Sequence, residues 1–582
     1  MENSRNHYII SKALKRFIFA SIMTSAAGQL ASAFDAVVLA QFEGEEAVSA
    51  LSLVMPVTTF ISCLGLLFAF GANTLVARAI GRHDTNSASA IFSTSVWTIL
   101  LLGMGCSILL WTAVPGMVDA IVPDDSLRAL PAGYLGVYVL GAWLEMLSYA
   151  LCLFVATDGH PRRVTLAVGA GVLTNVVVDV LAVGWYEWGI EGVAWGTLSQ
   201  FAVNVLLLCF YLRSRSCSYR LVWPGSKMRR LFVQNVLEGV PVTISNVLMA
   251  VTVLIINGMV YDAQGEEGLF FWSVCLQMLL ISAVFINGVM EALFAIGGVM
   301  VGERDVRGFS LLTRDALLAV ILLVSVLVVL MWVPDLVGVM FGVENAEKMD
   351  DMNDVLRSFS LMIPPFSLTL LLVAAYQVQE RMGLSIVVVV GQLVVMMVCV
   401  GIFAYETPDD VWLGFPIGGF LFLAGQLLYT TVYSRRQKER LSALTLIPLE
   451  EGHSMDCSVR YHADEVHAVL SQVIDFLQGA GVGKDTVFKL RLCLEELMMN
   501  IVRHSHGRIV HHSFDVHVYT DGERTCVTMK DGGRPFDPLK AGRLATSRNE
   551  TGKNIGLRIV ANILPDISYK YMYGLNIVMI NV

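Results

Sequence analysis

Long apolar segments recur along the first three-quarters of the chain, separated by short polar stretches. About 20 apolar residues suffice for a helix to cross the hydrocarbon core of a bilayer. Twelve segments approach or exceed that length, at 18–40, 50–76, 89–112, 133–156, 164–185, 189–212, 234–260, 268–299, 315–337, 358–378, 384–404 and 412–433. Only 15% of all residues are charged, against roughly a quarter in soluble domains. The pattern predicts an all-α polytopic membrane protein with twelve transmembrane helices.

Charge sorts the loops between these segments into two classes. If the N-terminus is inside, the inside segments hold 22 Lys and Arg, whereas the outside loops hold three. The outside loops are acidic instead, with runs such as 43–46 and 350–351. Basic residues remain on the cytoplasmic side during insertion. We therefore expect a multi-pass protein of the plasma (inner) membrane with both termini in the cytoplasm.

The twelve segments form two sets of six that repeat each other. The tripeptide Gly-Glu-Glu at 44–46 returns at 265–267, and the turn Gly-Arg-His-Asp at 81–84 returns as Gly-Glu-Arg-Asp at 302–305. Six helices per repeat leave both halves in the same orientation, so their pseudo-axis runs along the membrane normal. This predicts two lobes facing a central cleft, as in transporters. No short repeated filter loop favours a channel.

The boundaries that follow from these repeats give an N-lobe at residues 1–220 and a C-lobe at 221–440. Within the N-lobe, the apolar segment 164–185 carries Asp179, with Asn175 four residues earlier on the same helix face. An Asp at the centre of a spanning helix costs about 2.5–3.5 kcal/mol on insertion scales. Asp179 should therefore face a protein interior or an aqueous cavity.

Over roughly residues 10–435 the chain resembles the multidrug and toxic compound extrusion (MATE) family of secondary antiporters. In the DinF-like branch of that family, a cation site combines an Asp on helix 1, an Asn and an Asp four apart on helix 5, and a Thr on helix 6. The matching positions are Asp35, Asn175, Asp179 and Thr197. The resemblance implies the MATE fold, H⁺ or Na⁺ as coupling ion, and a small organic, often cationic, substrate. The alternative is that the two Asp residues only fix helix packing.

Two positions bear on this resemblance. Many relatives have a proline that bends helix 1; Ala20 stands there, and only the second repeat keeps a proline, Pro241. Bending of helix 1 as the coupling movement is therefore in doubt. In the second repeat, Glu291 lies within an apolar segment. It is a candidate for a second protonation site or, equally, for a substrate contact.

Beyond residue 440 the chain changes character. A linker at 441–453 precedes a block, 454–582, in which charge rises and no apolar run can span a bilayer. Strands are predicted at 454–460, 525–529 and 575–582, and amphipathic helices at 464–479 and 485–504. We expect a cytoplasmic α+β sandwich.

Three motifs follow one another in this block: Leu-Glu-Glu-Leu-Met-Met-Asn at 494–500, Asp-Gly-Gly-Arg-Pro-Phe-Asp-Pro at 531–538, and Gly-Lys-Asn-Ile-Gly-Leu at 552–557. Together they resemble the GHKL (Bergerat) ATPase fold, and the second is nearest the anti-sigma-factor serine kinases. A histidine autokinase is rejected, because neither His462 nor His467 has the sequence context of a phosphoacceptor.

The resemblance and the chemistry of the side chains imply a Mg²⁺–ATP site. Asn500 offers an oxygen to Mg²⁺, Glu496 is the candidate catalytic base, and Asp531 accepts from adenine. The other expected ATP-binding residues are Gly533, Gly552, Asn554 and Gly556. Asn554 replaces a usual glycine, so a degenerate domain that binds no ATP is the alternative.

Three functions are consistent with these features. The first is a cation-coupled exporter of organic compounds with an ATP-binding regulatory domain. The second is a membrane-tethered serine kinase or partner-switching protein that uses the transporter fold as a sensor, and the third is a lipid-precursor flippase. ATPase or kinase activity of the C-terminal domain stays open in each of them. The expected partners are a small substrate, the bilayer and a cytoplasmic regulatory protein, with no nucleic acid.

Overall fold

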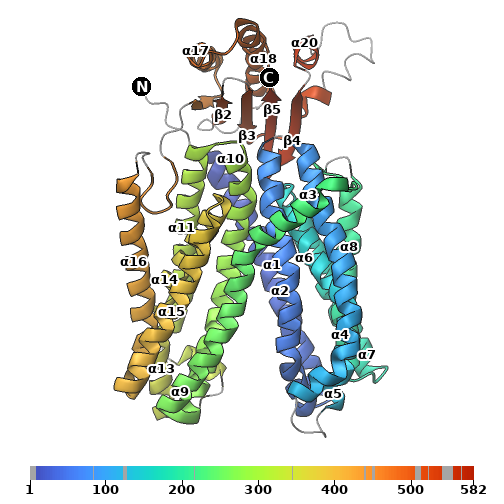
Figure 1. Cartoon of the computed structure of the whole chain (residues 1–582), viewed down its shortest axis with the longest axis vertical. Helices are drawn as coiled ribbons and strands as arrows, with labels where there is room; N and C mark the ends of the chain where they lie inside the picture. Colours follow the sequence, from blue (N-terminus) through green and yellow to red (C-terminus); the bar gives the residue numbers. More distant parts are fainter. Residues whose placement is uncertain are drawn as a thin grey trace.

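The computed structural model describes residues 8–82, 84–121, 128–214, 217–333, 335–341, 343, 345–437, 441–448, 453–504, 513–521, 524–540, 555–564 and 566–582. These residues form a bundle of long helices with a small sheet domain on one end, and the strands lie between that domain's own helices and the bundle (Figure 1). The predicted fold class, a polytopic helical membrane region followed by an α+β domain, is confirmed.

The N-lobe helices alternate in direction and are joined by short turns. A π-helical segment, Ile99–Gly103, links α3 to α4, and a 3₁₀ turn, Val139–Gly141, links α5 to α6, so each pair makes one crossing. The helices are α1 Tyr8–Phe42, α2 Glu45–Gly81, α3 Thr85–Thr98, α4 Met104–Ile121, α5 Ala129–Tyr138, α6 Ala142–Thr157, α7 Pro161–Gly184 and α8 Ile190–Leu212.

The C-lobe repeats this arrangement, with one long continuous stretch at its start. Its helices are α9 Met228–Ala292, α10 Gly298–Gly302, α11 Val306–Met331, α12 Leu336–Met340, α13 Ala346–Ser360, α14 Ile363–Val378, α15 Met382–Glu406 and α16 Gly414–Arg436. A 3₁₀ turn, Gly225–Lys227, precedes α9; a π-helical segment, Leu293–Gly297, joins α9 to α10; and a 3₁₀ segment, Pro408–Leu413, precedes α16.

The described residues contain 11 helical stretches long and apolar enough to cross a membrane. One of them, residues 225–302, has 78 residues and would be more than 110 Å long as a single helix, several times the thickness of a hydrocarbon core of about 30 Å. It turns back at Gly265, whose φ of 66° is not helical. Glycine adopts this backbone conformation without a Cβ clash. That stretch therefore supplies two crossings, and the twelve expected segments are all present.

The C-terminal domain is a two-layer sandwich. Its sheet has the order β1-β2-β3-β5-β4, with every neighbouring pair antiparallel. Its elements are β1 Ser454–Arg460, α17 Ala463–Gly479, α18 Lys484–His504, β2 Ser513–Thr520, β3 Thr525–Asp531, α20 Ile555–Ile563, β4 Ile567–Met572 and β5 Leu575–Asn581. Phe514, Val516 and Val518 of β2 point into the core under the helices, which also holds Leu494 of α18.

Two strands of this domain were not predicted, β2 and β4. In β2 the alternation of Phe514, Val516 and Val518 is an ordinary strand signal, and the polar residues Asp515 and His517 lie between them. Both are buried, at 1% and 2% exposure, because this sheet is covered on both faces. The alternating strand pattern was therefore present in the sequence, but the polar residues of β2 are buried and do not face solvent.

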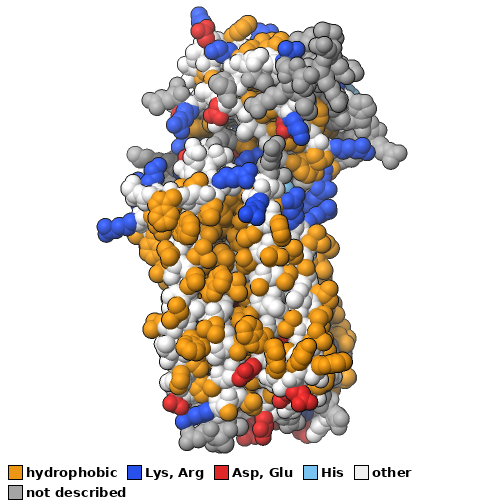
Figure 2. Space-filling view, turned by 90° about the vertical axis from the view of Figure 1, so that its right-hand side faces the viewer, with side chains coloured by type: hydrophobic (Ala, Val, Ile, Leu, Met, Phe, Trp, Pro, Cys, Tyr) orange, Lys and Arg blue, Asp and Glu red, His pale blue; other side chains and the backbone are white. Residues whose placement is uncertain are grey.

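The surface of the bundle shows where a membrane would lie. On the face in Figure 2, hydrophobic side chains form a broad band, Lys and Arg gather between this band and the sheet domain, and Asp and Glu lie at the opposite end. The same separation of charge appeared in the loops of the sequence. The described linker residues are not a free tether, since Leu441, Leu446 and Ile447 are buried in the core of the membrane region.

Candidate functional site

The four predicted cation-binding residues meet inside the N-lobe. Asp35 comes from α1, Asn175 and Asp179 come from α7, and Thr197 comes from α8. The exposed fraction is 8% for Asp35 and 0% for Asn175 and Asp179. The Thr197 hydroxyl donates to Asp35 Oδ2 at 3.4 Å, and the two carboxyl groups interact electrostatically.

Asp35 interacts with Asn175 and Asp179 inside this cluster, but most polar atoms of the cluster have no hydrogen-bond partner outside it among the described residues. These atoms are Asp35 Oδ1, both amide atoms of Asn175 and both carboxylate oxygens of Asp179. Buried polar atoms are almost always hydrogen-bonded, and two adjacent carboxylates in a low-dielectric interior repel each other. A proton or a cation with hard oxygen ligands would relieve both problems. The donor set therefore fits H⁺ or Na⁺.

Gly196 of α8 makes the close packing of this cluster possible. A Cβ atom at this position would overlap Asp179 Oδ1 and would stand 3.2 Å from the amide nitrogen of Asn175. Only glycine leaves the Asp179 carboxyl group its present place. Gly196 was not assigned to the site from the sequence.

The other membrane residue singled out from the sequence, Glu291 of α9, lies away from this cluster. Its carboxyl group interacts with the Ser21 hydroxyl of α1, so it faces the N-lobe from the C-lobe. This position is compatible with both interpretations, a second protonation site and a substrate contact.

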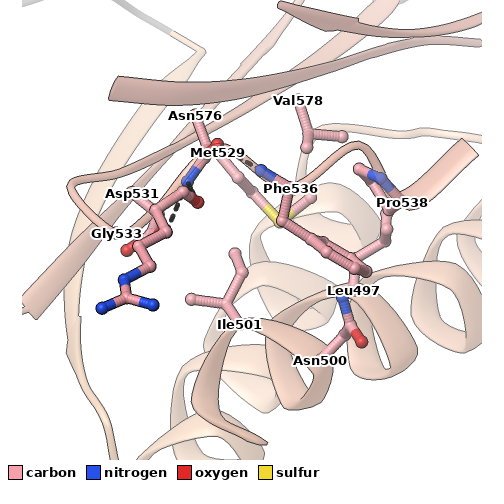
Figure 3. A pocket seen from close by; sticks show the side chains of 11 residues that line it. Leu497, Asn500, Ile501, Met529, Asp531, Gly533, Phe536, Pro538, Asn576 and Val578 are labelled. Carbon is pink, nitrogen blue, oxygen red and sulfur yellow. Dashed lines mark hydrogen bonds between the residues drawn. The ribbon is translucent and has the colours of Figure 1, made fainter. Parts of the chain in front are cut away.

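Asn500, Asp531 and Gly533 line one cleft in the C-terminal domain (Figure 3). Apolar side chains make up most of its walls, with a few buried polar groups among them, as in many sites for small molecules. The lining residues are Leu497, Asn500, Ile501, Met529, Asp531, Gly533, Arg534, Phe536, Pro538, Asn576 and Val578.

A hydrogen-bond network holds the Asp531 carboxylate at the cleft. Oδ1 accepts from the Tyr461 hydroxyl at 2.7 Å, and Oδ2 accepts from Asn576 Nδ2 at 3.0 Å. Burial and the nearby Asp531 raise the pKa of Tyr461 well above its usual value, so this hydroxyl stays a donor. A Cβ atom at Gly533 would lie 2.8 Å from Asp531 Oδ2, which explains the glycine. Tyr461 and Asn576 belong to no sequence motif and were not predicted.

The remaining predicted nucleotide residues are only partly placed. Glu496 lies one helical turn before Asn500 on α18, and its carboxyl group packs against Gly556 at the start of α20. Neither Glu496 nor Gly556 lines the cleft. Gly552 and Asn554 lie outside the described residues.

The second face of the sheet binds the C-lobe through the turn at 302–305. Lys530 Nζ lies 2.5 Å from Glu303 Oε2 and 3.6 Å from Asp305 Oδ2. His517 pairs with Asp456 at 2.8 Å and its other ring nitrogen lies 3.1 Å from the Glu303 carbonyl oxygen. Exposure of Lys530, Glu303 and Asp305 is 6%, 5% and 0%. These charges are shielded from water, so the contact is specific to this docked arrangement.

The same face of the sheet also binds the N-lobe. Lys12 of α1 donates to the carbonyl oxygen of Gly532, in the Asp-Gly-Gly turn that borders the cleft, at 2.6 Å. Tyr573, in the β4–β5 turn, donates to the carbonyl oxygen of Thr157 at 2.6 Å, and its ring packs on Phe17. The sheet domain thus touches both lobes at one end of the bundle.

The two lobes also hold each other at this end. Arg78 of α2 pairs with Glu238 of α9 at 2.6 Å and donates to the Gln377 carbonyl oxygen at 2.7 Å. A Cβ atom at Gly81 would overlap the carbonyl oxygen of Val299, and one at Gly302 would overlap that of Arg78. Glycine at both positions lets the two backbones touch. The sheet domain therefore lies over a closed junction between the lobes.

The fold is that of a multi-pass membrane protein with a fused two-layer sheet domain, and the comparison with known families agrees. Residues 20–181 match the family MatE, and residues 459–581 match the family described as histidine kinase-like ATPase domain. The chain carries a MATE family domain and a C-terminal histidine kinase-like ATPase domain. The comparison distinguishes neither the DinF-like branch nor the anti-sigma kinase type.

Curated relatives resemble part of the membrane region. The chain is 27% identical over 222 residues to multidrug export protein MepA of Staphylococcus aureus strain RF122, a match that covers 37% of the chain. It is 22% identical over 245 residues to MepA of Staphylococcus saprophyticus, a match that covers 42% of the chain. The matches span only about half of these relatives, 48% and 54% of their lengths.

Solved structures share the fold of the membrane region. A MATE transporter in complex with MaL6 superposes with a TM-score of 0.68 at 20% identity, covering 73% of this chain and 96% of that one. A multidrug resistance MATE transporter of the MOP superfamily in an outward-facing conformation gives 0.68 at 21% identity, covering 73% and 95%.

Proposed function

We propose that the chain is a cation-coupled antiporter that exports small organic compounds across the plasma membrane. The unpartnered buried atoms of Asp35, Asn175 and Asp179 carry this proposal, since they need a proton or a metal cation. The name of the MepA relatives, multidrug export protein, supports the substrate class. H⁺ and Na⁺ both suit the donor set, and a cationic substrate would be compatible with exchange for either.

Efflux of ethidium from proteoliposomes under an imposed H⁺ or Na⁺ gradient tests this function. Asp35→Asn and Asp179→Asn keep the shape of the side chains but remove the charge, and we expect both to abolish gradient-driven efflux. Asp262→Asn is the matched control, because Asp262 is an exposed carboxylate on α9. Normal efflux in both N-lobe variants would remove this site from the mechanism.

The orientation proposed here has both termini in the cytoplasm. It is supported by the basic residues between the apolar band and the sheet domain and the acidic residues at the far end (Figure 2). A reporter fused after Val582 should be cytoplasmic, and one inserted at Gly265 should be external. The opposite result would separate the nucleotide cleft from cytoplasmic ATP.

The C-terminal domain is proposed to bind Mg²⁺–ATP. Asp531 would accept from the adenine amino group, the apolar walls of the cleft would hold the ring, and Asn500 would offer its side-chain oxygen to Mg²⁺. Glu496 would act as the base in ATP hydrolysis or in phosphoryl transfer to a serine hydroxyl, once it leaves Gly556.

Calorimetry on the purified full chain at millimolar Mg²⁺–ATP tests nucleotide binding. Asn500→Ala and Asp531→Ala should lose the binding heat, and chelation of Mg²⁺ should weaken it. Glu496→Ala should retain binding and lose turnover, because a base acts on the reaction and not on adenine. An absence of binding heat in the unaltered chain would favour a degenerate domain.

The proposed role of this domain is regulation. It contacts both lobes where they touch each other, so we infer that it stabilises the arrangement in which the lobes are closed at the end of the bundle beneath the sheet domain. A ligand shifts such an equilibrium only if it binds the two states differently. The Lys12–Gly532 hydrogen bond ties α1 to the turn between Asp531 and Gly533, two residues that line the cleft. Efflux by the full chain should differ from efflux by a truncation after Arg440 when both are measured with and without ATP.

A second candidate, a membrane-tethered signalling kinase, is favoured by two side chains of the C-terminal domain. Glu496 and Asn500 are both present on α18, one turn apart. If the truncated chain matched the full chain in both conditions, this candidate would move ahead for the C-terminal domain.

A further inference from the structure

Glu145 of α6 is a buried carboxyl group that the proposed cation site does not use. Its exposed fraction is 2%, and it lies in the apolar interior of the N-lobe. Ser62 of α2 donates to Oε1, and the hydroxyl of Tyr138 on α5 donates to Oε2 at 2.6 Å. No Lys, Arg or His of the described residues pairs with it.

The titratable groups within electrostatic range of Glu145 come from three elements. They are the Cys63 thiol of α2, the hydroxyls of Tyr134 and Tyr138 on α5, and the Tyr149 hydroxyl of α6. All of these groups are neutral at neutral pH in their ordinary state. No described cation therefore balances the charge of Glu145.

Two opposing effects act on this carboxyl group. Burial without a cation disfavours the charged form, whereas hydrogen bonds from two hydroxyls favour it. Because hydroxyls donate or accept as they rotate, Ser62 and Tyr138 can serve either form. A glutamine would satisfy the same hydroxyls without the cost of a buried charge, so packing alone does not require a carboxyl group here.

A short path of side chains joins Glu145 to the cation cluster. The ring of Tyr138 stacks on that of Tyr134, with centroids 5.6 Å apart and planes at 17°. The Tyr134 hydroxyl interacts with Thr197, and Thr197 donates to Asp35. Glu145 is thus connected to the cation cluster through Tyr138, Tyr134 and Thr197, with a ring stack joining the two tyrosines.

We propose that Glu145 is a second proton-binding carboxyl group of the N-lobe, separate from the Asp35–Asp179 pair. The carboxylate takes one proton from water that enters the lobe, which forms an O–H bond and neutralises the side chain. The reverse step returns that proton to water. The inference rests on the proposed function only for the use of this proton in transport, since proton binding is measurable without substrate.

Infrared difference spectroscopy on the full chain in lipid, as the pH falls from about 9 to about 5, tests this site. The C=O stretch of each newly protonated carboxyl group appears as a separate band. We expect Glu145→Gln to lack one band that titrates in the unaltered chain, and to keep the band that Asp35→Asn removes. Survival of that second band also shows that Glu145→Gln folds.

Tyr138→Phe supplies a second readout, because it removes one hydrogen bond and leaves the carboxyl group. The Glu145 band should remain and shift in frequency and in titration midpoint. Identical titrating bands in the unaltered chain and in Glu145→Gln would overturn the inference. That result would leave the proposed transport function intact. If instead Glu145→Gln loses its band and Asp35→Asn shows normal efflux, the proposed cation site would be overturned and the inference about Glu145 would stand.

Discussion

The contact between Lys530 and the turn at 302–305 should decide whether the sheet domain stays docked. Lys530 faces two acidic groups, Glu303 at 2.5 Å and Asp305 at 3.6 Å, and all three side chains are almost completely buried. Removing one partner of a buried ion pair costs about 3–5 kcal/mol, because the other charge stays buried and uncompensated. Lys530→Met removes the ammonium group that faces the Glu303 and Asp305 carboxylates and should weaken docking more than about a hundredfold.

Because Lys530 has two acidic partners, substitutions at Lys530 and at Glu303 should weaken docking to different extents. Glu303→Gln leaves Asp305 beside Lys530 and should be the mildest change. Lys530→Glu places three carboxylates together and should be the most severe. Combining Lys530→Glu with Glu303→Lys should restore part of the docking, although Asp305 would still repel the new glutamate.

Spin-label distances between Phe488→Cys on α18 and Arg435→Cys at the end of α16 report docking, since both positions are exposed. The label background should lack the exposed Cys209. The docked chain should give one narrow distance distribution, and the variants should broaden it in the stated order. Lys489→Met, on the exposed side of α18, is the matched control. Equal distributions for Lys530→Met and the control would refute the assignment of docking to this ion pair.

Three further changes follow from single contacts. Gly196→Ala should abolish gradient-driven efflux, because its Cβ would overlap Asp179 Oδ1, whereas Gly169→Ala on α7 has open space and should leave efflux unchanged; equal efflux in the two would contradict the packing argument. Burial lowers the pKa of His160 in the folded chain below the value of 6.5 that it has in the unfolded chain. The neutral imidazole therefore stabilises the fold fully above pH 6.5, and this stabilisation is lost as the pH falls through the lower pKa of the folded chain. The unaltered chain should therefore lose more thermal stability between about pH 7.5 and pH 5 than His160→Gln does, and equal losses would speak against it. Lys12→Met should change the ATP affinity of the full chain, as measured by calorimetry. It should leave the cation dependence of efflux in the absence of ATP unchanged. An unchanged ATP affinity would mean that α1 does not influence the proposed nucleotide cleft.

The membrane fold could be predicted from the sequence because its signals are local. Each crossing is a continuous apolar run, and the lipid environment excludes most other interpretations of such a run. The Asp35 cluster was found by the cost of a charge in that environment, together with the family pattern. Glu145 lies in an apolar segment just as Glu291 does, but it was missed, and only the structure shows the hydroxyls that reach it from α2 and α5.

The docking surface could not be predicted, since it depends on segments far apart in sequence. In the sequence, residues 302–305 are recognisable only as the repeat of 81–84. The docking role lies in a residue that differs between the two copies. Arg82 of the first copy is exposed, whereas its counterpart Glu303 is buried against Lys530. In β2 and β3, Asp515, His517 and Lys530 resemble solvent-facing positions until the bundle is placed against them.

Helix α1 carries Lys12 at one end and Asp35 further along, 23 residues and about 35 Å away. One continuous helix therefore contacts the turn beside the proposed nucleotide cleft and carries a residue of the proposed cation site. Binding free energies linked through a shared element are reciprocal: a factor by which ATP changes cation affinity is also the factor by which the cation changes ATP affinity. An exporter regulated by nucleotide through α1 is, by the same thermodynamics, a sensor that reports the ion gradient to the cytoplasm. Transport and signalling would then be two readouts of one equilibrium.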